Sequence, residues 1–307
     1  MRELHIIENA GVITANDTIA WLGEMRNFPT NIDDDVLAID CTNKVVMPGF
    51  IDAHTHILFA GSREEEFAMR AEGLSYQDIA ARGGGIVSTM SHVRTATKKE
   101  LKKNARKYLL QMLRQGTTSV EIKSGYGLDF HNEIKMLECI RELQQEELPT
   151  IVSTFLGAHA YPPEFRERKN EYVQLILDEM LPYIGEKHLA EFCDVFCETN
   201  YFSTEDAKKI LEKAQQYGMK LKLHAEELSN TAGAELAAAL QAVSVDHLEH
   251  IFESGIRALQ NAAKNESPTV AVLLPGVSFN LNHQYAPARV LIDAGIPVAI
   301  ASDINPG

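Results

Sequence analysis

Short apolar runs alternate with longer amphipathic segments from residue 45 to the end of the 307-residue sequence. The apolar runs have the length and β-branched content of buried strands, and the segments between them have the spacing of helices. This alternation predicts successive βα units around a parallel sheet. The expected strands are 45–57, 117–123, 150–158, 193–197, 220–224, 242–247, 270–279 and 297–301.

Helices are expected between most of these strands, over 98–115, 132–146, 171–183, 204–217, 231–241, 253–264 and 286–294. Eight βα units predict an α/β fold of the (β/α)8 TIM-like barrel type, with a flavodoxin-like or other open sheet as the alternative. Residues 1–48 lack helical periodicity and carry turn signals between short apolar runs, which predicts a few strands of a separate segment. The expected domains are therefore 1–48 and 49–307. The stretch 59–97 is expected to be a long functional loop.

Composition narrows the class of partner. The formal net charge of −14 argues against a basic nucleic-acid-binding surface and against binding to anionic membranes. No apolar run approaches the ~20 residues that a membrane-spanning helix needs, and the first residues lack a signal-peptide pattern. We expect a cytoplasmic protein with a small-molecule partner and neither nucleic acid nor membrane. Its oligomeric state is open, and a homodimer is one alternative.

Two histidines, His54 and His56, follow the first apolar run in the order D-A-H-T-H. Side chains alternate faces along a strand, so both rings point to the same side and could share one metal ion. Taken alone, an H-x-H pattern is more typical of two ordinary surface histidines at the end of a strand.

The barrel prediction gives a test, because catalytic groups of such barrels lie at the carboxyl ends of the strands. Histidines fall at several of these ends, and an aspartate follows the last strand. One metal ion, zinc or ferrous iron, would suit the nitrogen-rich set with a single carboxylate. The groups at the strand ends are His54, His56, His159, His224, His247 and Asp303, and the expected ligands are His54, His56, His224 and Asp303.

Acid and base roles fall to residues near the same ends. Glu227 lies three residues after His224, on the turn that leaves the fifth strand, and Glu226 beside it is expected to be an exposed carboxylate at a helix start. An ion held at this place would lower the pKa of water toward ~7, and Asp303 could accept the released proton. His247 could hydrogen-bond a developing oxyanion or the attacking water. Glu227 and His247 both remain candidates for protonating the leaving nitrogen.

These motifs resemble the amidohydrolase superfamily and, within it, the imidazolonepropionase family. The superfamily likeness rests on P-G-F-I-D-A-H-T-H together with His224, His247 and Asp303. The narrower likeness rests on longer blocks: F-A-G-S-R-E-E-E-F, A-R-G-G-G-I, E-I-K-S-G-Y-G-L, F-L-G-A-H-A-Y-P-P and A-S-D-I-N-P-G. The resemblance implies a metal-dependent barrel that hydrolyses the ring amide of 4-imidazolone-5-propanoate to N-formimidoyl-L-glutamate.

The resemblance also implies roles by position. One zinc or iron ion would be held by the four ligands named above, and Glu198 or its neighbours stand where many relatives have a carboxylated lysine that bridges two metals. Arg63 could clamp the propanoate carboxylate, or could instead pair with the glutamates that follow it. The implied substrate contacts are Arg63, Tyr76, Tyr126, His159, Glu227, Asn305 and Gly307.

The sequence departs from the family pattern at its ends. Family members build a small β-sandwich from segments on both sides of the barrel, so we expect residues 1–48 to be a partial sandwich and the barrel to be truncated after its eighth strand. The alternatives are a related deaminase and an inactive, truncated paralogue that acts as a binding module. Arg63 favours the hydrolase over the deaminase, because a nucleobase has no carboxylate to meet it.

Overall fold

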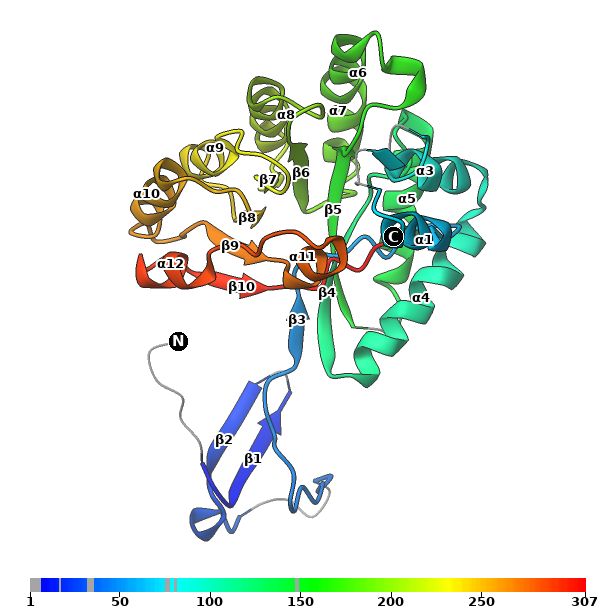
Figure 1. Cartoon of the computed structure of the whole chain (residues 1–307). Coiled ribbons are helices and arrows are strands. Elements are labelled where there is room, and N and C mark those ends of the chain that lie inside the picture. Colours follow the sequence, from blue (N-terminus) through cyan, green and yellow to red (C-terminus); the bar gives the residue numbers. More distant parts are fainter. Residues whose placement is uncertain (1–6, 17, 32–35, 75–77, 80–81, 147–148) are drawn as a thin grey trace. The chain divides into compact units, whose positions relative to one another are not determined.

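The structure is a computed structural model that describes residues 7–16, 18–31, 36–74, 78–79, 82–146 and 149–307 (Figure 1). The chain forms two compact units, Met1–Pro48 and Gly49–Gly307. In the first unit, strands β1 (Ala10–Ala15) and β2 (Thr18–Glu24) make an antiparallel hairpin with an irregular register between Ile13 and Thr14. The ring of Trp21 meets the edge of Phe28 at a centroid distance of 5.3 Å, which gives the hairpin an aromatic contact of its own.

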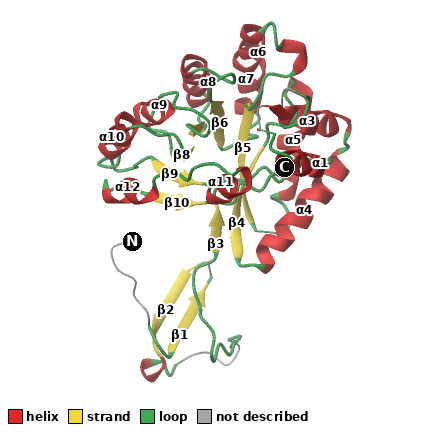
Figure 2. Ribbon diagram, in the orientation of Figure 1, coloured by secondary structure: helices red, strands yellow, loops and turns green. Residues whose placement is uncertain are grey.

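The second unit is an eight-stranded parallel sheet, rolled into a barrel with helices outside it (Figure 2). The (β/α)8 prediction is confirmed. The strands pair in chain order: β3 (Phe50–Asp52), β4 (Thr117–Lys123), β5 (Thr150–Ala158), β6 (Phe192–Cys197), β7 (Lys220–Ala225), β8 (Ser244–His247), β9 (Val270–Leu273) and β10 (Val298–Ile300).

The helices follow the strands in the order that βα units require. Within the described residues, the short helices α1 and α3 precede the first long one, and a π-helical turn at Ile176–Met180 joins α6 to α7. The helices are α1 (Glu64–Ala71), α3 (Ile86–Thr95), α4 (Lys98–Arg114), α5 (Phe130–Leu143), α6 (Lys169–Leu175), α7 (Leu181–Glu186), α8 (Thr204–Gln216), α9 (Gly233–Ala239), α10 (Glu253–Ala262), α11 (Pro275–Leu281) and α12 (Ala288–Asp293).

The barrel closes between the first and last strands, just beyond their carboxyl ends. The backbone N–H of Asp303 donates to the carbonyl of His54 at 3.0 Å, and the N–H of His56 donates to the carbonyl of Ile304 at 2.8 Å. Asp52 adds a carboxylate contact, accepting the N–H of Ser302 at 3.1 Å. These bonds bring residues from opposite ends of the barrel sequence to one place.

Three predictions differ most from the structure. The first strand is confined to Phe50–Asp52, because only this part pairs with β4. The predicted loop 59–97 contains α1 and α3 within its described residues. The predicted strand 270–279 ends at Leu273, because Pro275 starts α11 at a position where a missing N–H costs nothing.

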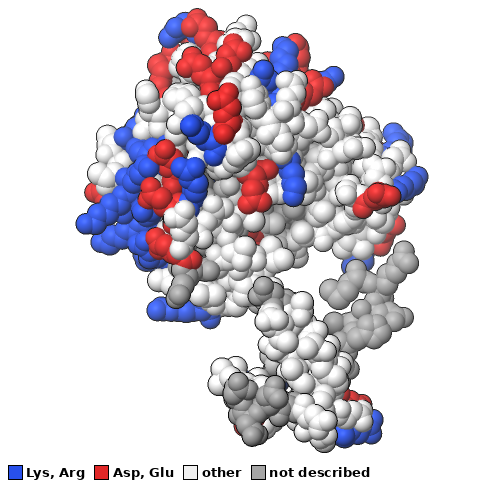
Figure 3. Space-filling model, turned by 180° about the vertical axis from the view of Figure 1, so that it is seen from behind, with Lys and Arg blue, Asp and Glu red and all other residues white. Residues whose placement is uncertain are grey.

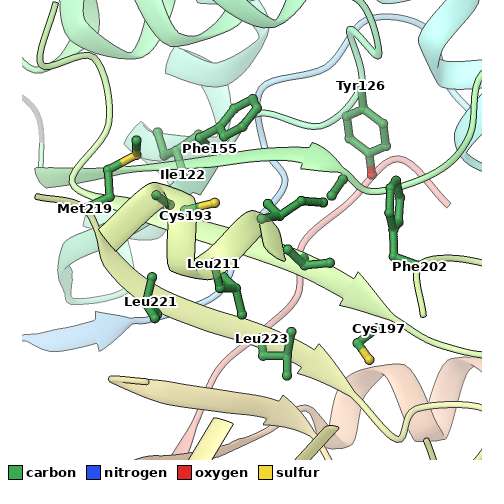
Figure 4. Close-up of a cluster of buried hydrophobic side chains, with 14 of the residues drawn as sticks. Ile122, Tyr126, Phe155, Cys193, Cys197, Phe202, Leu211, Met219, Leu221 and Leu223 are labelled. Atoms are coloured by element: carbon green, nitrogen blue, oxygen red, sulfur yellow. The ribbon is translucent and has the colours of Figure 1, made fainter. Parts of the chain in front are cut away.

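An apolar layer between strands and helices holds the barrel together. Figure 4 shows part of it, where Leu211 of α8 faces Leu221 and Leu223 of β7, and Phe155 and Cys193 lie on neighbouring strands. These side chains are 0 to 3% exposed. Burial of such side chains contributes about 1.5–3 kcal/mol each.

On the outside of the barrel, charged residues of α4 form ion pairs with residues of α5 and of the turn that follows it. Lys98 contacts Glu138 and Glu142, and Arg106 bonds Glu146 with two parallel hydrogen bonds. Seen from behind, basic and acidic side chains intermingle along the left side of the view (Figure 3). Among the described residues, no helix has the length and apolar character needed to cross a bilayer.

We expect Leu109→Ala to lower the free energy of unfolding by roughly 2–5 kcal/mol. Leu109 lies on the buried face of α4, so its truncation leaves a cavity. Its neighbour Leu110 is 39% exposed and is the matched control, so Leu110→Ala should cost no more than about 0.5 kcal/mol. Urea denaturation measures both variants. Equal losses would contradict this packing of α4.

Candidate metal and substrate site

A cavity of about 330 Å³ opens at the carboxyl ends of the barrel strands. Most residues that the sequence analysis selected lie around it, and His54 lies fully buried beside them. Tyr76 lies outside the described residues, so the structure does not place it. The selected residues that line the cavity are His56, Arg63, Tyr126, His159, His224, Glu227, His247, Asp303, Asn305 and Gly307.

The four expected ligands lie together. Nε2 of His54 and Nε2 of His56 are 3.3 Å apart, and Oδ1 of Asp303 is 3.5 Å from the first and 3.3 Å from the second. Nε2 of His224 is 3.4 Å from Nε2 of His56. Tetrahedral ligands bonded at about 2.0–2.2 Å lie about 3.3–3.6 Å from one another. The atoms of His54, His56 and Asp303 therefore have the spacing of ligands to one metal ion, and His224 lies next to this group through its contact with His56.

A second grouping overlaps the first. Ligand atoms of His54, His224 and His247 also lie within 4.8 Å of one another. His247 is therefore a further potential ligand, beside the role in catalysis that the sequence suggested. Oδ1 of Asp303 is buried without a hydrogen-bond partner, as expected of an oxygen whose natural partner is a cation.

The rings of His54 and His56 are kept neutral, as metal ligands must be. Burial, followed by the charge of Lys123 for His54 and by the nearby His159 for His56, holds the pKa of both rings well below its usual range. Burial likewise raises the pKa of the Asp303 carboxyl to about 7. A carboxyl in this setting is stabilised as an anion when a cation lies beside it.

Buried carboxylates orient two of the rings from behind. Oδ2 of Asp246 is 2.6 Å from Nδ1 of His54, so this ring carries its proton on Nδ1 and turns Nε2 to the ligand cluster. Oδ2 of Asp194 lies 2.9 Å from Nδ1 of His224 as a close but poorly aligned ion-pair contact, and its Oδ1 accepts the backbone N–H of His224. Such carboxylates fix the tautomer and raise the basicity of the ligand.

Each of these carboxylates has a buried lysine as its counter-ion. Lys123 lies 2.8 Å from Asp194 and 2.7 Å from Glu121, and Lys222 lies 3.2 Å from Asp246. Burial alone would lower the pKa of Lys123, but the charges of Asp194 and Glu121 raise it overall. Lys123 therefore stays charged, and the interior of the barrel contains a network of ion pairs.

Glu227 and His247 both line the cavity and lie next to each other, with Oε2 of Glu227 3.6 Å from Nε2 of His247. Burial, reinforced by the charge of Glu249, raises the pKa of Glu227 well above its usual range. A carboxyl with a raised pKa can carry a proton near neutral pH and act as a general acid or base.

Arg63 lines the same cavity and is held by the loop that follows Asp303. One guanidinium nitrogen donates to Oδ1 of Asn305 at 3.1 Å, and Nε is buried without a partner. A Cβ on Gly307 would lie 2.6 Å from the guanidinium, so a larger residue here would displace the side chain of Arg63. The arginine is only 8% exposed and keeps hydrogen-bonding capacity free for a ligand.

Tyr126 and His159 come from the loops after β4 and β5. Nδ1 of His159 donates to the carbonyl of Gly125 at 2.9 Å, which leaves Nε2 for the cavity. Glu133 shapes the first loop by accepting the backbone N–H groups of Gly125, Gly127 and Leu128. Burial raises the pKa of Glu133, and these bonds oppose that effect.

Glu226 and Glu198 are both buried and accept backbone N–H groups. Glu226 was expected to be exposed, but it is fully buried and accepts the backbone N–H of Ala234 at 3.3 Å. Glu198 is 2% exposed and is occupied by the N–H groups of Leu228 and Ser229. Its carboxylate thus holds the loop after β7, and the single metal expected from the sequence stays a prediction.

The model of the amidohydrolase family matches residues 45–306, which include the whole ligand set. The chain belongs to the amidohydrolase family. Members depend on metal ions, and the histidine cluster is a suitable site for one.

Within the amidohydrolase family, the chain groups with the imidazolonepropionases. The imidazolonepropionase of Clostridium tetani is 45% identical over 308 residues, covering 100% of this chain and 72% of its own length. That of Thermoanaerobacter pseudethanolicus is 50% identical over 269 residues, covering 88% of this chain and 64% of its own length.

Solved structures share the fold at low identity. A guanine deaminase from C. acetobutylicum, with guanine bound, has a TM-score of 0.64 at 16% identity and covers 99% of this chain and 71% of its own. A 5-methylcytosine deaminase from Klebsiella pneumoniae has a TM-score of 0.70 at 15% identity, with coverage of 96% and 72%. These matches support the barrel and do not favour the deaminase alternative.

We expect Asp246→Asn to weaken metal binding by roughly 10- to 100-fold, because the neutral amide holds Nδ1 of His54 less tightly and leaves Lys222 without its counter-ion. Metal retention against a competing chelator measures the effect. Asp293→Asn is the control, since that carboxylate is exposed on α12. Equal retention by both variants would show that Asp246 does not support the metal.

Proposed function

We propose that the chain hydrolyses the ring amide of 4-imidazolone-5-propanoate to N-formimidoyl-L-glutamate. The observation that carries this proposal is the placement of Arg63, a buried cation with free hydrogen-bonding capacity, at the cavity that contains the ligand cluster. A substrate with a reactive ring at one end and a carboxylate at the other matches this pair of features. The names of the relatives support the same reaction.

In this proposal, His54, His56, His224 and Asp303 hold one zinc or iron ion, since imidazole and carboxylate ligands suit both metals. When bound, the ion would lower the pKa of water and polarise the ring carbonyl. Elemental analysis of the purified protein distinguishes the two metals. The homodimer expected from the sequence stays a prediction for sedimentation analysis.

The chain's own residues orient the substrate and move protons. Arg63 binds the propanoate carboxylate, while Tyr126 and Nε2 of His159 hydrogen-bond the ring from one side, and Asn305 and Gly307 line the opposite wall. Asp303 accepts the proton of the attacking water. Glu227, beside His247, delivers a proton to the ring nitrogen as its bond to the carbonyl carbon breaks, so that this nitrogen becomes the neutral terminal nitrogen of the formimidoyl group.

Arg63→Ala should raise KM for 4-imidazolone-5-propanoate roughly 10- to 100-fold, because a charge-assisted pair to the carboxylate contributes about 1.5–3 kcal/mol. Metal content should stay the same, since Arg63 is not among the proposed ligands. Steady-state kinetics and elemental analysis measure the two quantities. Arg257→Ala, on an exposed arginine of α10, is the control. An unchanged KM would remove Arg63 from substrate binding.

Removal of the metal should abolish hydrolysis and lower the melting temperature, because a ligand that binds only the folded state stabilises it. Dialysis against a chelator, followed by addition of Zn²⁺ or Fe²⁺, tests both effects. Activity that survives complete removal of metal, verified by elemental analysis, would rule out a metal-dependent reaction at this site.

A further inference from the structure

Glu249 is a buried carboxylate that the proposed reaction leaves without a role. It is 4% exposed, and its Oε1 accepts the hydroxyl of Ser278 at 3.0 Å. Its Oε2 has no hydrogen-bond partner and lies 3.7 Å from Nδ1 of His247, which is also buried and without one. A buried polar atom without a partner costs about 1–3 kcal/mol, so two such atoms that face each other need an explanation.

The backbone holds the two side chains in this arrangement. His247 and Leu248 have φ values of 82° and 70°, which are left-handed conformations that side chains other than glycine rarely adopt. The N–H of Leu248 donates to the carbonyl of Ala225 at 3.1 Å, and the N–H of His250 donates to the carbonyl of Glu226 at 2.8 Å. Strain of this kind persists where the surroundings impose it, often at functional sites.

The strained turn has a specific geometric result. It places the side chain of Glu249 beside the ring of His247, two positions earlier in the chain. The carbonyl of Glu249 accepts the side-chain amide of Gln284, and Ser278 of α11 holds the carboxylate. Glu249 is therefore fixed from two sides, with one oxygen left toward His247.

On the proposed function, we infer that Glu249 is a positioning residue that accepts the Nδ1–H of His247 and so keeps Nε2 of that ring unprotonated toward Glu227 and the cavity. A shift of less than 1 Å closes the gap of 3.7 Å to hydrogen-bonding distance. Hydrogen bonds in catalytic sites commonly shorten in this way when substrate binds. The carboxylate of Glu249, the ring of His247 and the carboxyl of Glu227 then lie in a row. Nε2 of His247 can accept a hydrogen bond from the protonated carboxyl of Glu227.

Kinetics test the role of Glu249 with a pair of variants. Glu249→Leu removes the acceptor at similar size, and kcat should fall roughly 10- to 100-fold while KM and metal content stay within about twofold. Glu249→Gln keeps an oxygen that can accept the Nδ1–H, and it should restore kcat to within about fivefold of the unaltered protein. Glu253→Leu, on an exposed glutamate four residues later, is the control for the loss of a surface charge.

A merely structural role would give a different result, with Gln as damaging as Leu, or with KM and metal content changing together with kcat. Either outcome, or an unchanged kcat in Glu249→Leu, overturns the inference.

A second measurement does not depend on turnover, and so separates this inference from the proposed function. Nitrogen NMR of the zinc-loaded protein, with the signals of His247 identified by their loss in His247→Gln, reports which ring nitrogen carries the proton. We expect the Nδ1–H tautomer, with a shift toward Nε2–H in Glu249→Leu. An Nε2–H tautomer in the unaltered protein contradicts the inference, even if the protein hydrolyses its proposed substrate.

Discussion

Closure of the barrel is the constraint on which the site depends. The backbone bonds that join the first and last strands involve His54, His56 and Asp303, whose side chains are three of the proposed ligands. Fold and ligand cluster therefore form in one step, because pairing these segments places the side chains within 3.5 Å of one another. A bound ion would in turn stabilise the closure, since it links the same two ends of the sheet.

The charged interior serves the same ligands. Burying five ionised groups is costly unless each has partners, and removal of one member leaves another charge without compensation. Here the lysines neutralise two aspartates, and each aspartate supports a histidine. The network costs desolvation free energy, and in return its aspartates hold the two histidine rings in place. Buried polar networks stabilise a fold only when every member has a partner, and here the members are Lys123, Lys222, Asp194, Asp246 and Glu121.

Sequence reasoning predicted the strands well where both faces are covered. The boundaries of β4 and β5 agree residue for residue with the prediction, because turn signals and helices bound them clearly. The first strand was overextended, since an apolar run looks the same whether or not a neighbouring strand pairs with it. The helix α1 was missed, although the run Glu64–Glu66 is a signal for a helix N-terminus.

The ligands could be predicted and their supports could not, for one physical reason. Ligands follow the strand ends, and histidine is conspicuous there. The supports lie one layer deeper, as polar residues at alternate positions in apolar strands, such as Glu121 and Lys123, or Ser244 and Asp246. This period of two does mark inward-facing positions, but it does not say which strand supplies the partner. Only the arrangement of the strands in the barrel determines that, and it places Asp194 of β6 beside His224 of β7.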